Sequence, residues 1–427
     1  KDLTFASTTT DGAISQANAS SGALGGSNIV ITEAVQKAST LAVKADKITF
    51  GVKPEDKNQT AQPTDFATGV GHLEAKNLEV AGKSHTLQEK LILRNVAVAD
   101  DKVTAGEGRA SGNLIIGKSN ATGGLEVDGG KFNYTSGDMT LVSGSITVKN
   151  TDADKGAVSN LTFDKDTKIL VTGTSTTAFA AKAEGKNAVL DISKAKLEAS
   201  GSGTYQTVFS AATEGRLVIS NEQVKAVAEA KTNPLQSVQF KAGEKGTLAF
   251  SDAVTLELGT GKNNPIAVDD YNVTSNTSGG TVEANSGLTL NYTGNAGTNP
   301  HYAVSGTLVA SSLKVNAKEG STAKDFVLGD GVYKISSGLD SENSGNFVAV
   351  SGSAAPGTKS TLLLGAVSTN EKGELVTSKG GSATNIEVQT NGVVGVQSGE
   401  WNGKKLKVTD GSFTIGYKDT TGDKTAN

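Results

Sequence analysis

The chain of 427 residues contains no cysteine. Two interpretations fit this absence. It can arise by chance in a protein of a reducing compartment, or it can reflect export through an oxidising periplasm, where a stray thiol would misfold the translocating chain. We favour export. The chain also begins at Lys1 without a methionine or an apolar leader, so we expect a mature or excised piece whose signal segment has been removed.

Aromatic residues make up only 5% of the chain, and arginine occurs only at Arg94, Arg109 and Arg216. The net charge is −4, its signs alternate along the sequence, and the lysines are not interleaved with aromatic residues. A nucleic-acid partner is therefore not expected. The longest apolar runs are only about four residues, far too short for a helix that crosses a bilayer. The sequence predicts no helical membrane span.

Glycine is abundant, with 52 residues, about twice its usual ~7% share. Apolar residues make up 36%, and proline occurs only six times. Serine, threonine, asparagine, alanine and valine fill most of the rest. This composition is typical of many short strands joined by turns, with few apolar residues to support each strand.

An apolar pair returns every seven residues in "GLEVDGGKFNYTSGDMTLVSGSITVKN" (124–150). One polar residue separates the two members of each pair, which indicates strands with one buried and one wet side. We expect eight side chains to point into one core and Glu126, Asn133, Thr140 and Thr147 to point outward. The inward residues are Leu125, Val127, Phe132, Tyr134, Met139, Leu141, Ile146 and Val148.

Two architectures fit this pattern. In a right-handed parallel β-helix, three strands form a coil of about 21 residues, and Leu125 stacks on Ile146 in the next coil. In an antiparallel meander, or in tandem β-sandwiches, Asp128-Gly129 is a hairpin turn and Leu125 faces Phe132. Stretched repeats, such as the eleven residues from Leu114 to Leu125, suit a solenoid with looped-out corners. We predict an all-β solenoid with some local hairpins.

The same pair spacing of seven recurs elsewhere. It is found from Leu41/Val43 to Ile48/Phe50, from Val96/Val98 to Val103/Ala105, from Leu190/Ile192 to Leu197/Ala199, and from Leu406/Val408 to Phe413/Ile415.

Residues 1–270 are predicted to form the solenoid, and 271–427 either continue it or form a second β-rich domain. Residues 52–70 read as a polar loop. "NEQVKAVAEAKT" (221–232) predicts a short helix with Asn221 as its N-cap, and "TEAVQKAS" (32–39) predicts a weaker one.

Catalytic residues are not predicted. His72, His85 and His301 lie far apart in dissimilar contexts, and no G-x-S-x-G turn frames a serine. Asp128 and Asp138 could flank a sugar, but the aromatic platforms that sugar cleavage uses are scarce.

Calcium is the one cofactor with candidate ligands. "VDDYN" (268–272) and "LGDG" (328–331) place carboxylates on turns, so Asp269, Asp270 and Asp330 are weak candidates. No other metal or cofactor is predicted.

These features together resemble the passenger regions of Gram-negative autotransporters and related large surface adhesins. The resemblance is one of style, without a diagnostic motif, and its residues are "SGNLIIGKSNATGGLEVDGGKFNYTSGDMTLVSGSITV" (111–148), "KNAVLDISKAKLEASGSG" (186–203), "GDGVYKISSG" (329–338) and "GVVGVQSGEWNGKKLKVTDGSFTIG" (392–416). The chain departs from the family pattern because it ends in "TTGDKTAN" with no translocator barrel. A cleaved or excised passenger, or another export route, would account for that ending.

The resemblance implies an extracellular protein of the bacterial cell surface that acts in adhesion, autoaggregation or matrix contact. Its expected partners are other copies of itself, a host or matrix surface, or a polysaccharide. A self-assembling surface-layer or filament subunit is the first alternative. A polysaccharide-active β-helix enzyme is the second.

Overall fold

The computed structural model describes most of the chain between residues 70 and 415, together with three short stretches before residue 51. The described residues are 3–5, 24–31, 40–50, 70–80, 84–87, 90–99, 102–117, 122–173, 179–204, 206–259, 264–268, 279–293, 301–317, 326–341, 347–352, 359–365, 368–369, 375–376, 382–383, 385–396 and 405–415. The predicted helix at 32–39 and almost all of the predicted loop at 52–70 lie outside them.

Strands dominate this part of the chain, and α1 (Asn221–Ala228) is the one α-helix among the described residues. In the same residues, no helix is long and apolar enough to cross a membrane. The chain divides into two compact units, Lys1–Lys241 and Ala242–Asn427. The domain boundary that we expect near residue 270 stays a prediction.

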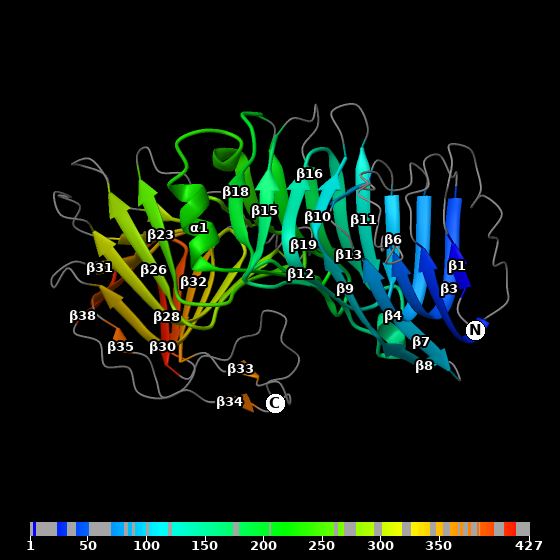
Figure 1. Cartoon of the computed structure of the whole chain (residues 1–427). Helices are drawn as coiled ribbons and strands as arrows, with labels where there is room; N and C mark the ends of the chain where they lie inside the picture. Colours follow the sequence, from blue (N-terminus) through cyan, green and yellow to red (C-terminus); the bar gives the residue numbers. More distant parts are fainter. Residues whose placement is uncertain are drawn as a thin grey trace. The chain divides into compact units, whose positions relative to one another are not determined.

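The first unit is a parallel β-helix (Figure 1). Its strands are β1 (Leu3–Phe5), β2 (Leu24–Ile31), β3 (Thr40–Phe50), β4 (Val70–Val80), β5 (Ser84–Leu87), β6 (Lys90–Arg94), β7 (Val96–Ala99), β8 (Lys102–Ala105), β9 (Glu107–Ser111), β10 (Asn113–Ile116), β11 (Gly123–Asp128), β12 (Gly130–Leu141), β13 (Gly144–Lys149), β14 (Ser159–Phe163), β15 (Thr167–Val171), β16 (Phe179–Glu184), β17 (Ala188–Asp191), β18 (Lys196–Ala199), β19 (Thr207–Ala212), β20 (Arg216–Ile219) and β21 (Val238–Ala242).

Three sides build each coil, and each side is a run of parallel strands. Side I contains the first halves of β3 and β4, then β6, β11, β13, β16 and β19. Side II contains their second halves, then β9, the first half of β12, β14, β17 and β20. Side III contains β5, β10, the second half of β12, β15 and β18.

The opening stretch forms one coil and the start of the next. Leu125 pairs in parallel with Ile146, and Val127 with Val148, so the 21-residue coil is confirmed and the antiparallel pairing of Leu125 with Phe132 is wrong. All eight predicted inward residues are buried. Of the predicted outward residues, Asn133, Thr140 and Thr147 are half-buried, but Glu126 is only 4% exposed.

One seven-residue repeat is not a coil. Val96/Val98 and Val103/Ala105 lie on β7 and β8, which pair antiparallel, with Val98 opposite Val103. This hairpin is inserted between β6 on side I and β9 on side II. Val96 and Val103 are buried in one cluster with Ala157, which belongs to the insertion between β13 and β14, two coils further along the chain.

Helix α1 follows β20 of side II, at the place in the coil where the preceding coil has the side III strand β18. Its N-cap is Ser220, not the predicted Asn221, because the Ser220 side chain accepts a hydrogen bond from the backbone N–H of Gln223. Gln223 completes the cap, since its side-chain oxygen accepts from the Ser220 N–H at 3.0 Å. The buried Gln223 amide also donates to the Ala195 carbonyl at 2.8 Å, which ties the helix to the preceding coil. The helix ends at Ala228, four residues before the predicted end.

We expect Ser220→Ala to lower the free energy of unfolding by about 1 kcal/mol, because the substitution removes the cap acceptor. Asn221→Ala is the matched control, and its effect should stay below about 0.5 kcal/mol because Asn221 is already inside the helix. Urea titration followed by circular dichroism measures both. Equal losses would contradict this assignment of the cap.

The second unit repeats the parallel arrangement. Its strands are β22 (Thr247–Phe250), β23 (Val254–Gly259), β24 (Ile266–Val268), β25 (Thr281–Ala284), β26 (Leu288–Thr293), β27 (His301–Tyr302), β28 (Thr307–Ala317), β29 (Phe326–Leu328), β30 (Gly331–Ser341), β31 (Phe347–Val350), β32 (Ser360–Leu364), β33 (Ser368–Thr369), β34 (Leu375–Val376), β35 (Ser382–Ala383), β36 (Asn385–Val388), β37 (Gly392–Val396), β38 (Lys405–Val408) and β39 (Gly411–Ile415).

Three sides are again present. Side IV holds β27, β29, β31, β36 and β38. Side V holds β22, β25, the first halves of β28 and β30, then β32, β37 and β39. Side VI holds β23, β26, the second halves of β28 and β30, and β35. The pair β33–β34 is antiparallel.

The last described coil leaves apolar side chains uncovered. Leu406 and Val408 pair with Ile386 and Val388, which are fully buried in the core column. Leu406 is nevertheless 37% exposed and Val408 49% exposed, since no described strand follows them on side IV. These are the exposed large apolar residues of the part of the chain that the structure describes.

Candidate functional site: a charged ladder on side I

A column of alternating charges lies on the outward surface of side I. Arg94, Asp128, Lys149 and Glu184 occupy it on β6, β11, β13 and β16, which belong to successive coils. We call this column the ladder. The backbone register extends it toward the N-terminus, where Glu74 pairs with Arg94 and Lys44 pairs with Glu74.

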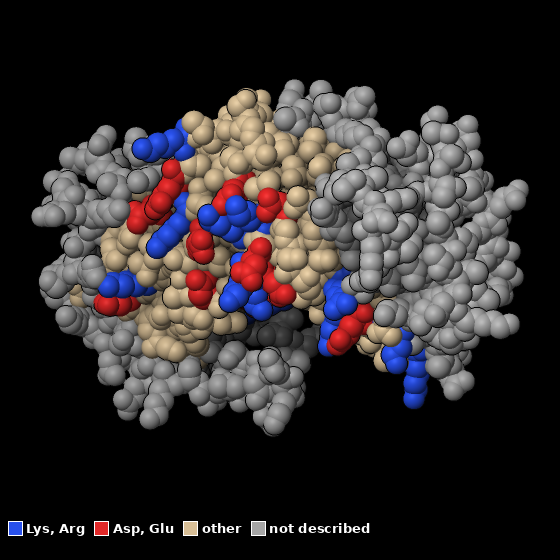
Figure 2. Space-filling view, in the orientation of Figure 1, with Lys and Arg blue, Asp and Glu red and all other residues tan. Residues whose placement is uncertain are grey.

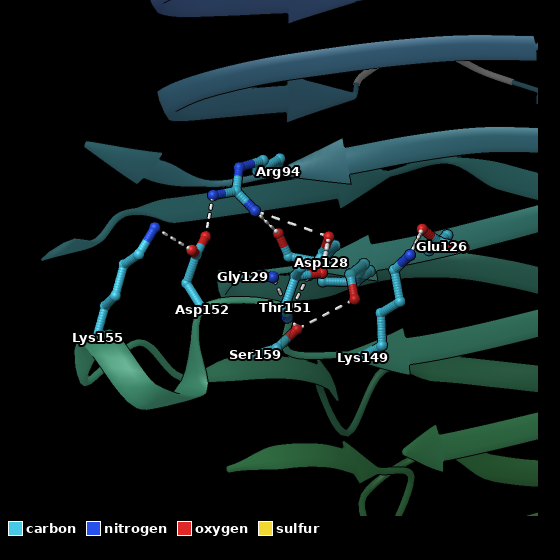
Figure 3. A network of polar contacts seen from close by, with 10 residues as sticks. Arg94, Glu126, Asp128, Gly129, Lys149, Thr151, Asp152, Lys155 and Ser159 are labelled. Atoms are coloured by element: carbon cyan, nitrogen blue, oxygen red, sulfur yellow. Dashed lines mark hydrogen bonds and ion pairs between the residues drawn. The ribbon is translucent and has the colours of Figure 1, made fainter. Parts of the chain in front are cut away.

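Arg94 joins two coils and an insertion (Figure 3). Its guanidinium forms an ion pair with Asp152 and lies 3.7 Å from the Asp128 carboxylate. Asp152 stands at the start of a short 3-10 helix, η1 (Ala153–Lys155), inserted between β13 and β14. Lys155 reaches back to Asp152 at 2.9 Å. The ladder therefore holds the η1 insertion against the coil.

Asp128 fixes the same insertion from the opposite side. Its carboxylate accepts the Thr151 backbone N–H at 2.9 Å and the Thr151 hydroxyl at 2.6 Å. The next residue, Gly129, donates its N–H to the Ser159 hydroxyl at 3.0 Å, and that hydroxyl donates to the Val127 carbonyl at 3.1 Å. These bonds satisfy the polar groups at a corner where the chain leaves side I.

Glu126 lies one outward position before Asp128 and is covered by lysines from the coils on both sides. Lys149 contacts its carboxylate at 2.7 Å, and Lys90 forms a second ion pair with it. This cover explains why a residue on the outward side of a strand is buried. Burial raises the pKa of Glu126, but the hydrogen bonds and charges of Lys149 and Lys90 outweigh burial, so the pKa lies below its usual value.

The neighbouring charges shift two other groups. The hydrogen bond from Arg94, followed by that from Lys155, lowers the pKa of Asp152. The hydrogen bond to Glu126 raises the pKa of Lys149, and the charges of Asp128 and Glu184 add to this rise. Each ladder charge thus acts on charges of the coils beside it. Arg94 pairs with Asp128 within the ladder, while Lys149 pairs with Glu126 and Glu184 with Lys182 beside it, so the ladder belongs to a wider network of opposite charges on side I.

Acid should weaken the first unit through these carboxylates. Since the pKa of Glu126 is lowered by folding, its ion pairs stabilise the fold above the ordinary glutamate pKa of about 4.3 and are lost as pH falls below it. We expect Glu126→Gln to be less stable than the parent chain at pH 7, with the difference shrinking toward pH 3. Urea titrations at several pH values measure this. Asp166→Asn, at an exposed turn, is the control and should change the free energy of unfolding at pH 7 by less than about 0.5 kcal/mol.

Charges of both signs lie interspersed on the visible face of the described residues (Figure 2). Side III supplies one such cluster, in which Glu198 contacts Lys196 at 2.6 Å and Lys168 at 3.4 Å. The hydrogen bond from Lys196 lowers the pKa of Glu198.

The structure separates the predicted site residues. Asp128 belongs to the ladder, whereas Asp138 lies on the second half of β12, where its backbone N–H donates to Asn113. Asp269 and Asp270 lie outside the described residues. Asp330 is described, and its backbone carbonyl accepts the Ser305 N–H at 2.9 Å. Within the described ranges, no three His, Cys, Asp or Glu side chains gather as metal ligands.

The three histidines lie on three different strands. His72 lies on β4, His85 on β5 and His301 on β27, and their side chains are not among those described. The sequence does not single out Arg94, Lys149 or Asp152 as members of a site. Unequal spacing hides the ladder, because loops of different length separate its members.

Comparison of the chain with family models, with curated proteins and with solved structures found no match.

Proposed function

We propose that this chain acts at the bacterial cell surface, in adhesion, autoaggregation or matrix contact, through the repeated outward positions of its coils. Its partners would be other copies of itself, a host or matrix surface, or a polysaccharide, and it would work without a cofactor or a catalytic step. Nucleic acid is not proposed as a partner.

One observation carries this proposal. On side V, a single outward column is uncharged over seven consecutive coils, and its members are in parallel register. The column consists of Thr247, Thr281, Thr307, Val332, Thr361, Val393 and Ser412. Neighbouring members are separated by about 4.8 Å, the spacing of adjacent strands. Such a column offers many weak contacts to another surface, and together they bind strongly even though each is weak.

The test compares substitutions in this column with substitutions in another. We expect Thr281→Lys with Thr307→Lys to weaken autoaggregation or matrix binding by about tenfold, because two neighbouring contacts become charged and bulky. The matched control is Thr255→Lys with Thr289→Lys, which places the same charges on neighbouring strands of side VI. The control should stay within about twofold of the parent chain. Equal losses in both variants would contradict the proposed contact column.

Single polar residues away from the column should matter little. We expect a change at Asp269, Asp270 or His301 to leave binding within about a factor of two, because the proposed binding is shared among many weak contacts. A screen for polysaccharide hydrolysis is run beside the binding assay. A carboxylate substitution that abolishes a measurable turnover while circular dichroism stays unchanged would replace this proposal with an enzyme.

A self-assembling surface-layer or filament subunit is the second candidate function. The exposed Leu406 and Val408 favour it, because exposed apolar side chains on a strand gain free energy when another strand packs on them. Leu406→Lys with Val408→Lys should abolish ordered fibres or sheets in electron micrographs if assembly is the function. Fibres that persist in this variant would contradict end-to-end assembly.

A further inference from the structure

Consecutive coils of side I are nearly interchangeable in their apolar core. Leu93, Val127 and Val148 follow one another in one inward column, and Leu91, Leu125 and Ile146 follow in another. If β6 paired with β13 and left β11 out, Leu93 would meet Val148 and Leu91 would meet Ile146. These contacts are as apolar as the native ones. The core therefore does not distinguish the native order from one in which a coil is skipped.

Neither the backbone nor the chain connection prevents such an error. Parallel strands form the same hydrogen bonds whatever their side chains, and the residues of a skipped coil would loop out at a corner. The entropy cost of closing a loop rises only slowly with its length. The interaction that makes a skipped pairing less stable than the native one must therefore come from side chains outside the core.

The ladder supplies an interaction of this kind. In native order, Arg94, Asp128, Lys149 and Glu184 alternate in sign over four coils. Skipping the coil of Asp128 or the coil of Lys149 places like charges side by side, because alternate members share a sign. Arg94 would meet Lys149, and Asp128 would meet Glu184. Like charges on directly opposed strand positions destabilise the pairing, whereas opposite charges favour it.

We infer that the alternating ladder sets the order of these coils during folding, because it disfavours pairings that skip the coil of Asp128 or the coil of Lys149. This role is independent of the proposed function. It concerns which strands pair while the chain folds. The ion pairs of the folded structure form as a result of the correct pairing. Lys149 is the most informative member, because its sign differs from that of the coil on either side.

The absence of cysteine allows a direct test in the full chain. Ile92 and Thr147 both pair with Glu126, from opposite sides, so one strand separates them in the native coil. That separation, about 9.6 Å, exceeds the reach of a disulfide. In a skipped pairing they become neighbours. Ile92→Cys with Thr147→Cys therefore reports the error when the chain refolds with an oxidant. Ser145→Cys with Ala180→Cys, a native pair, is the positive control.

Lys149→Glu is introduced into the Ile92→Cys and Thr147→Cys chain. We expect it to raise the cross-linked fraction roughly fivefold, because the new carboxylate is repelled by Asp128 and attracted by Arg94. Lys149→Gln should give an intermediate rise. The matched control is Lys165→Glu, the same charge reversal at an exposed turn between β14 and β15, which should leave the fraction unchanged. Non-reducing gels of soluble and pelleted protein give the readout even where a variant misfolds.

Salt provides a second measurement on the unaltered ladder. At about 1 M salt the screening length falls to ~3 Å, so we expect the cross-linked fraction of the Ile92→Cys and Thr147→Cys chain to rise. If Lys149→Glu and Lys165→Glu give the same fraction, or if salt does not change it, the ladder does not set coil order.

Discussion

The substitution Leu141→Asp is expected to unfold several neighbouring coils of the first unit. Leu141 is 1% exposed and lies in register between Ile116 of the coil before and Val171 of the coil after. A carboxylate at this position would have no partner within an apolar column. Burying an unpaired charge there costs more free energy than the apolar packing of one coil contributes to stability. We expect a loss above about 4 kcal/mol in the free energy of unfolding, or no folded protein at all.

Thr140→Asp is the matched control, because it places the same charge one residue earlier on the outward side of β12. It should cost less than about 1 kcal/mol. Far-ultraviolet circular dichroism and urea titration of the two variants give the comparison. A Leu141→Asp variant as stable as Thr140→Asp would mean that residue 141 does not face the core.

The second large effect is expected at the corner between β11 and β12. Gly130 has a φ of +85°, and a Cβ there would lie 1.9 Å from the backbone carbonyl oxygen of Asn95. Its N–H also donates to the Val158 carbonyl at 2.6 Å, so the backbone cannot move away without losing that bond. We expect Gly130→Ala to destabilise the unit by about 3 kcal/mol or more, from a backbone clash added to left-handed strain.

Gly156→Ala separates the two causes. Gly156 has a similar φ of +82°, but a Cβ at this position would meet nothing within 4 Å, so only the backbone strain remains. We expect a loss of about 1 kcal/mol. Thermal and urea unfolding of both variants measure the difference. If the two losses are equal, close packing of the coils at this corner is not what requires Gly130.

Much of the fold can be predicted from the sequence because a coil repeats a simple rule. The alternation in 124–150 predicts which side chains are buried, and the spacing of seven predicts that Leu125 stacks on Ile146. The same spacing at Val96 and Val103 fails, since two short apolar pairs can also form an antiparallel hairpin with equal alternation. Pair spacing by itself does not carry strand direction.

The candidate site could not be predicted because it depends on register between coils. Glu126 reads as an outward residue, and its burial follows only once Lys90 and Lys149 are placed on the strands beside it. Likewise, the contact of Arg94 with Asp152 joins residues far apart in sequence through an insertion whose length no pattern predicts. The prediction of Asn221 in place of Ser220 fails for a local reason, since the two adjacent residues are equally good caps by residue type.

Two cysteine pairs that share one position test the parallel coil most directly. Glu126→Cys with Thr147→Cys places thiols on strands that are parallel neighbours about 4.8 Å apart, well within disulfide reach. Glu126→Cys with Lys131→Cys places them on different sides of the coil, but directly opposite each other in a hairpin at Asp128-Gly129. After mild oxidation of the folded protein, the account predicts a disulfide in the first variant and free thiols in the second, read by mass spectrometry. A disulfide in the second variant with free thiols in the first would contradict the parallel β-helix.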